Sequence, residues 1–132
     1  MRSNLTGIWL SRYRYPSSSR AAELEGQHYV RIFRKGRFLI AESLPKINAS
    51  YLLMRLALDD NVIAGSWQEE TNPDGYYKGA IYHGAIQLLL DEARNRMHGQ
   101  WVGFGKDKEV NVGPWELTYV GENLPDSISR KS

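Results

Sequence analysis

The sequence predicts an all-β protein, an eight-stranded antiparallel up-and-down (meander) barrel, and three observations lead to this fold class. Short segments in which apolar and polar residues alternate recur along the chain, and turn-forming residues separate them. A Gly-x-Trp triplet occurs four times, each time within one of these segments. The 132 residues include no cysteine, so neither disulfides nor a zinc ribbon can hold the fold, and an apolar core must do so.

Eight segments are predicted to be strands, and the chain length allows one domain. In chain order they are Leu5–Tyr15, Gln27–Arg34, Arg37–Ser43, Ala49–Leu58, Val62–Thr71, Lys78–Leu90, Arg96–Phe104 and Glu109–Val120. The barrel is expected to span residues 1–120, followed by a polar tail at 121–132. The one ambiguous stretch is Ala85–Met97, which could form a helix on propensity alone.

The connections are predicted to differ between the two ends of the barrel. Lys35–Gly36, Asp59–Asn61 and Asp91–Asn95 are short and rich in turn formers, which favours tight hairpins. The other connections are longer, and binding groups usually lie in long loops on a rigid scaffold. These longer loops are expected at residues 16–26, 44–48, 72–77 and 105–108.

The four Gly-x-Trp triplets begin at Gly7, Gly65, Gly99 and Gly113. Because side chains alternate along a strand, the Gly and the Trp of each triplet share a face, and the apolar parity of each segment turns that face inward. The glycines would leave room for a neighbouring indole and let the strand bend. Two interpretations remain open: the tryptophans form a packed core, or they line a cavity large enough for one small ligand.

The ligand-binding interpretation predicts a set of site residues at the long-loop end. Inward aromatics would stack on the ligand, while Arg, Lys, Tyr and His would hold its polar or anionic part. The set is Trp9, Tyr13, Arg20, Trp67, Glu69, Tyr76, Tyr77, His83, Trp101 and Lys106. Against it, Asn72–Gly75 is also an ordinary turn signature, and His83 is also consistent with a surface or hydrogen-bonded core histidine.

Catalysis has no positive signal in the sequence. The motifs of serine hydrolases, P-loop proteins, dinucleotide-binding folds and zinc proteases are all absent. The histidines at 28, 83 and 98 show no metal-ligand spacing, so neither a cofactor nor a metal is expected. A barrel isomerase or cyclase with Glu69 or His83 as base remains an alternative.

The charge is uneven along the chain. Residues 1–55 hold 10 basic and 3 acidic residues, whereas residues 56–132 hold 7 basic and 12 acidic ones. A nucleic-acid-binding barrel that uses Arg12, Arg14, Arg31 and Arg37 is therefore a second alternative, although a net charge of +2 disfavours it. A self-association or protein-interaction module is a third, favoured if the barrel is full and an apolar patch lies outside.

The segment Leu5-Thr-Gly-Ile-Trp9, followed by a meander with recurring Gly-x-Trp, resembles the calycin superfamily of lipocalin-like, fatty-acid-binding and avidin-like barrels. The stretches Tyr76–Leu88 and Met97–Trp101 are similar to bacterial sensory barrels. Such barrels occur beside helix-turn-helix domains or on effectors that sense cyclic nucleotides. This resemblance implies a sensor of a small ligand, of nucleotide type or otherwise planar or anionic, with a fused or associated regulatory domain.

The expected location is cytoplasmic, without membrane contact. The N-terminus has no apolar core of signal-peptide length, and no run of about 18 apolar residues occurs. The lipocalin disulfide is also absent, which argues against a secreted transport protein.

Overall fold

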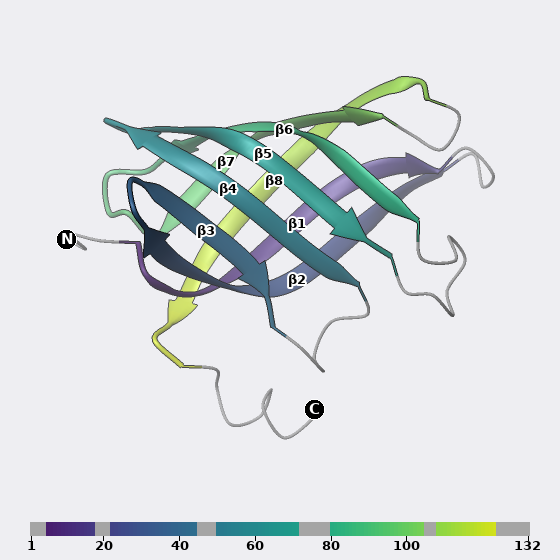
Figure 1. Cartoon of the computed structure of the whole chain (residues 1–132). Helices are drawn as coiled ribbons and strands as arrows, with labels where there is room; N and C mark the ends of the chain where they lie inside the picture. Colours follow the sequence, from purple (N-terminus) through teal and green to yellow (C-terminus); the bar gives the residue numbers. More distant parts are fainter. Residues whose placement is uncertain (1–4, 18–21, 45–49, 72–79, 105–107, 124–132) are drawn as a thin grey trace.

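A computed structural model describes residues 5–17, 22–44, 50–71, 80–104 and 108–123 and confirms the predicted fold class. Eight strands follow one another around a closed barrel, each antiparallel to the next, and the last strand pairs with the first (Figure 1). The strands are β1 (Gly7–Ser17), β2 (Ala22–Lys35), β3 (Phe38–Ser43), β4 (Tyr51–Asp59), β5 (Val62–Glu70), β6 (Ile81–Leu90), β7 (Arg96–Phe104) and β8 (Val110–Gly121).

Two local expectations are wrong. The stretch 16–26 is not a long loop, because β1 reaches Ser17 and β2 already begins at Ala22. Gly26 pairs with Tyr13 inside this ribbon, and a side chain on Gly26 would overlap the Tyr13 ring, so the glycine marks a close approach rather than a turn. The helical alternative for 85–97 also fails, because Ile86 and Leu88 are buried with the two-residue period of a strand.

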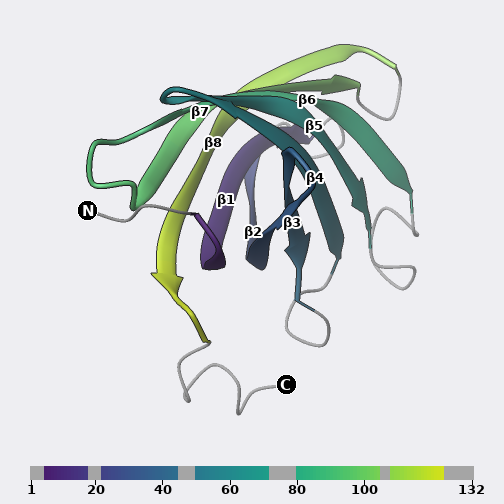
Figure 2. The same ribbon diagram turned by 60° about the vertical axis from the view of Figure 1, so that its left-hand side comes forward.

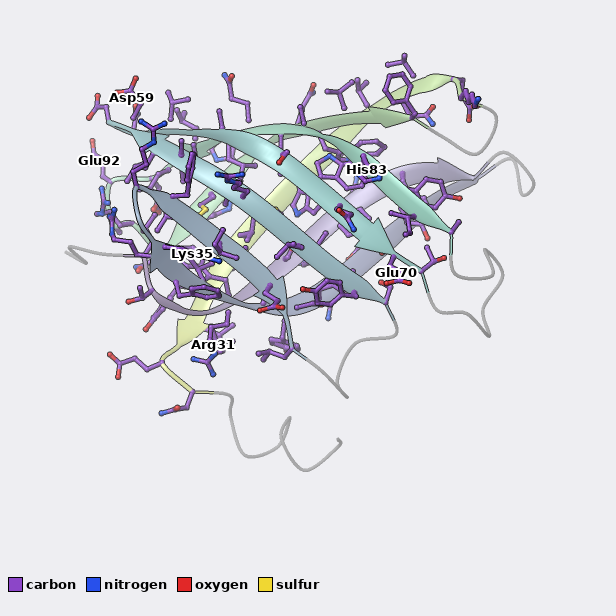
Figure 3. The ribbon with its side chains drawn as sticks, in the orientation of Figure 1. Arg31, Lys35, Asp59, Glu70, His83 and Glu92 are labelled. Atoms are coloured by element: carbon purple, nitrogen blue, oxygen red, sulfur yellow. The ribbon has the colours of Figure 1, made fainter. Side chains whose placement is uncertain are left out.

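The predicted difference in loop length between the two ends is only partly met, because four residues separate β1 from β2 whereas five separate β6 from β7. The turns that join β2 to β3, β4 to β5 and β6 to β7 lie together at one end, here called the short-turn end (Figures 1 and 2). Gly36 in the first of these turns has φ of 62°, which favours glycine. Charged side chains gather there, including Lys35, Asp59 and Glu92 (Figure 3). The last residues of β1, β3, β5 and β7 lie at the opposite end, here called the long-loop end.

The core has two different halves. At the short-turn end it is mostly aliphatic and closed by Trp9, which packs edge-on against Tyr119. The aliphatic members are Leu5, Ile32, Leu39, Leu56, Ile63, Leu88, Leu90, Met97 and Leu117. Toward the long-loop end the core still contains the buried Leu52, but aromatic and polar side chains join it there. We call the interior at the short-turn end the floor and the interior at the long-loop end the upper half. The floor is mostly apolar, whereas the upper half also contains polar side chains.

All four tryptophans point inward and are buried, which confirms their predicted face. Each indole N–H donates a hydrogen bond within the chain. The acceptors are the Leu5 carbonyl for Trp9 (2.9 Å), the Ala85 carbonyl for Trp67 (3.1 Å), the Arg14 carbonyl for Trp101 (2.9 Å) and Ser11 Oγ for Trp115 (2.7 Å). Leu52, Met54 and Leu56 of β4 also point inward and are buried, with Arg55 exposed outside.

The glycines of the barrel have two roles. Gly84 and Gly103 lie under the Trp67 ring, and Gly113 lies under the Trp101 ring, so these positions make room for an indole. A Cβ at Gly65 or Gly99 would overlap a backbone carbonyl oxygen of the neighbouring strand, and Gly84 and Gly113 meet a backbone carbonyl oxygen as well as an indole. Both roles follow from the tight interior of an eight-stranded barrel.

The close approach at Gly65 gives a stability prediction. A Cβ there would overlap the carbonyl oxygen of Arg55, so Gly65→Ala should lower the free energy of unfolding by about 2 kcal/mol or more. Ser66→Ala, on the exposed face of the same strand, is the control and should change it by less than about 0.5 kcal/mol. Equal urea midpoints for the two variants would contradict the tight packing.

Candidate functional site

Four polar side chains from different parts of the chain meet inside the upper half of the barrel. Glu69 Oε2 accepts hydrogen bonds from Tyr13 Oη and from Ser50 Oγ, both at 2.7 Å. Ser50 Oγ also lies 2.7 Å from His28 Nε2, and this nitrogen is 3.7 Å from Glu69 Oε2. The group joins β1 and β2 to β5 across the interior, and Ser50 enters from the residue before β4. We call these four residues the polar cluster.

Burial sets the protonation of this cluster. Removal from water, reinforced by the Glu69 carboxylate, raises the pKa of Tyr13 well above its ordinary value, so Tyr13 remains a donor. Burial lowers the pKa of His28, and Glu69 opposes that shift only in part. His28 is 3% exposed, and its Nδ1 has no hydrogen-bond partner among the described residues. A buried polar atom without a partner is uncommon in folded proteins.

Aromatic rings surround the polar cluster. The Tyr13 ring stacks on His28 at 6.0 Å between centroids and packs against Trp115 at 4.5 Å. Trp67 contacts Trp115 at 5.7 Å and meets Trp101 edge-on at 5.6 Å. The partly buried Tyr15 and Tyr82 pack against the same core. The carboxylate and the imidazole therefore lie in a largely aromatic environment.

Several side chains around the polar cluster keep a small solvent exposure. Tyr13, Trp67 and Trp101 are 6–7% exposed, and the Glu69 side chain is 15% exposed. At the short-turn end Trp9 is 0% exposed, while Tyr119 and Leu58 beside the core are half-buried.

The structure brings together four of the ten residues that the sequence predicted as a site. Tyr13, Trp67, Glu69 and Trp101 share the upper half of the barrel. Trp9 does not join them, because it lies in the floor against Leu5 and Tyr119. Arg20, Tyr76, Tyr77 and Lys106 lie outside the described residues.

His83 does not lie inside the barrel. Its side chain is exposed on the outer face of β6, where Tyr82 and Gly84 take the inward parity (Figure 3). The interpretation of His83 as a surface histidine therefore fits, and its expected place in the interior is wrong. The sequence left this parity ambiguous because polar, small and apolar residues are mixed at the start of β6.

Sequence reasoning missed three members of the site. His28 and Ser50 were not selected, and Trp115 was placed inward but left out of the binding set. The alternation of His28, Val30 and Ile32 along β2 is a signal that could have found the histidine. Nothing local marks Ser50, because its contacts to His28 and Glu69 are formed only by barrel closure.

The arginines proposed for nucleic-acid binding lie outside the barrel. Arg12, Arg14, Arg31 and Arg37 are exposed. Arg12 pairs with Glu25 at 3.1 Å, and on the same wall Arg96 pairs with Glu116 at 2.5 Å. The hydrogen bond from Arg96 holds the pKa of Glu116 below its usual range. Carboxylates therefore accompany two of the arginines on this surface.

The polar cluster does not have the arrangement of a nucleophilic serine. Such a serine needs a histidine whose second ring nitrogen is oriented by another group, and His28 Nδ1 lacks such a group among the described residues. Within the same residues, no three His, Cys, Asp or Glu side chains are close enough to hold a metal ion. The geometry is that of a hydrogen-bonding site in an aromatic pocket.

Comparison with known proteins assigns no family. No protein-family model matches the chain, and a search of curated proteins finds no match either. Among the described residues, no helix is long and apolar enough to cross a membrane.

The lowered pKa of His28 predicts a pH-dependent stability. Between the ordinary histidine pKa near 6.5 and the lower pKa in the folded protein, the unfolded chain binds a proton that buried His28 does not. The free energy of unfolding should therefore fall as the pH drops below about 6.5, by at most about 1.4 kcal/mol per pH unit from this group. Urea denaturation at several pH values measures it.

His28→Gln should flatten that part of the profile, because the amide does not titrate. His98→Gln is the matched control, since His98 is exposed on β7. A His28→Gln profile that runs parallel to the wild-type profile would show that His28 does not cause the dependence.

Proposed function

We propose that this chain is a non-catalytic small-molecule-binding barrel whose ligand enters at the long-loop end and stacks on inward aromatic rings. The observation that carries the proposal is the polar cluster, in which Glu69 and the unpartnered His28 Nδ1 lie among Tyr13, Trp67 and Trp101. The ligand would approach from the long-loop end, where Tyr13, Trp67 and Trp101 are 6–7% exposed and the Glu69 side chain is 15% exposed.

Stability alone gives no reason for such a cluster. Polar groups cost free energy when they leave water, even when hydrogen bonds compensate most of it. The floor of the same barrel is filled by leucine, isoleucine and methionine without such groups. A site that must recognise a polar ligand supplies the reason for the difference between the two halves.

The fold supports a finer proposal. A closed eight-stranded barrel is just wide enough to hold one small ligand, which is how calycin-like barrels are built. We therefore place this chain with the calycin-like barrels and propose a cytoplasmic sensory role in which ligand binding is transmitted to a fused or associated regulatory domain. A planar ligand suits the aromatic rings.

The four tryptophans give a direct test of ligand binding. In a fragment screen followed by NMR of ¹⁵N-labelled indole groups, binding fragments should shift the Trp67 and Trp101 signals. The Trp9 signal is the internal control and should not move, because its ring is sealed in the floor. Assignment uses single Trp→Phe variants.

Two outcomes of the NMR screen would contradict ligand binding in the upper half. If no planar fragment shifts an indole signal at concentrations up to about 10 mM, the upper half does not bind such ligands at even millimolar affinity. Shifts confined to surface groups would likewise contradict the proposal.

Self-association is a second candidate, favoured by an apolar patch on the outer face. Val102 pairs with Val112 and Phe104 with Val110, and these four side chains are 39–64% exposed. Lys108 and Glu109 lie exposed beside them, so two copies related by a twofold axis could match opposite charges around the patch. The proposed occupant is therefore a second copy of this chain.

A charge in this patch should break the dimer. Val112→Glu should be monomeric by sedimentation at concentrations where the wild type is dimeric, because a buried unpaired carboxylate is costly. Leu89→Glu is the control, since Leu89 is also apolar and 43% exposed but lies near the short-turn end of β6. A monomeric wild type at about 100 μM would exclude a dimer of even moderate affinity.

A further inference from the structure

The groups around Glu69 narrow the chemical class of the ligand. Resting on the function proposed above, we infer that the site selects a cationic ligand that carries N–H donors on a flat group, such as an amidinium or guanidinium compound. Three independent features lead to this class. The interior carries a negative charge, the polar cluster offers hydrogen-bond acceptors, and the indole N–H groups are already bonded within the chain.

The described interior carries a carboxylate without a compensating cation. Glu69 lies inside with 15% of its side chain exposed. Every described Lys and Arg is exposed except Arg94, which is half-buried in the turn between β6 and β7 at the short-turn end. An anionic ligand would therefore face Glu69 at short range in a poorly solvated site, where like charges repel strongly. A cation would be attracted by the same charge.

Proton counting shows that the polar cluster offers acceptors. Ser50 has one hydroxyl proton, which it donates to Glu69. Ser50 Oγ must then accept at its 2.7 Å contact with His28, so His28 Nε2 carries the ring proton. Since burial lowers the pKa of His28, the ring is neutral at pH 7 and Nδ1 is a bare acceptor. A ligand that fits these groups must bring donors.

The tryptophans offer ring faces and no donors. The indole N–H groups of Trp67, Trp101 and Trp115 all bond within the chain. The rings therefore offer a ligand no N–H donor, whereas an indole face attracts cations and stacks on flat groups. Delocalised planar cations satisfy the carboxylate, the bare imidazole nitrogen and the rings together.

Three probes of the same ring and similar outline test the inference: benzamidine, benzamide and benzoate, which are cationic, neutral and anionic at pH 7. NMR titration of the wild-type chain should show benzamidine binding at least about tenfold more tightly than benzoate, the scale of one charge-assisted hydrogen bond. Glu69→Gln should remove most of this preference while changing benzamide binding by less than about twofold.

Glu70→Gln is the matched control, because Glu70 is the next residue of β5 but is exposed (Figure 3). It should keep the wild-type preference, which separates contact with Glu69 from a general effect of net charge. The wild-type ranking of the three probes stands as a test even if Glu69→Gln is poorly folded.

The outcomes separate the two proposals. If all three probes shift Trp67 and Trp101 with equal affinity, or benzoate binds most tightly, the barrel binds planar ligands but cation selection is overturned. A preference that persists in Glu69→Gln also overturns it. If none of the probes binds at about 10 mM, the result contradicts the proposed function as well as the cation selection.

Discussion

Closure of the eight-stranded barrel is the constraint on which the rest of the structure depends. Every second side chain must enter an interior only a few side chains wide, and four of these are tryptophans. They fit because Gly84 and Gly103 lie under Trp67 and Gly113 lies under Trp101. Each indole N–H then finds an acceptor within the chain: on the adjacent strand for Trp67 and Trp115, on β1 for Trp101, and at the Leu5 carbonyl for Trp9.

The fixed rings define where polar chemistry can be placed. Aliphatic side chains and Trp9 pack the short-turn end. The long-loop end combines rings that keep a little solvent exposure with a carboxylate, two hydroxyls and a neutral imidazole. Tyr13 connects the aromatic rings to the polar cluster, because it packs on Trp115 and donates a hydrogen bond to Glu69.

The outside of the barrel has a different charge character from the inside. The described arginines of the first half of the chain lie on the surface. Two of them lie against the Phe38 ring, with the guanidinium of Arg55 4.2 Å and that of Arg37 5.4 Å from its centroid. The interior of the described chain contains Glu69 instead. A basic sequence is therefore compatible with an acidic site, because the alternation of a strand separates the two sets.

The sequence by itself determined the fold class, seven of the eight strands closely, and the inward face of all four tryptophans. These features depend on local alternation and turn residues, which are readable along a single chain. The second strand was predicted too short, because Gly26 resembles a strand boundary and its pairing with Tyr13 is not local.

Only the tertiary structure decided which of these residues form a site. Tyr13 and Glu69 are 56 residues apart, and Ser50 and His28 are 22 apart, so no spacing rule relates them. Barrel closure brings them within hydrogen-bond distance across the interior. The same closure places Trp9 in the floor and His83 on the outer face, because position along a strand and parity, rather than residue type, decide what an inward side chain meets.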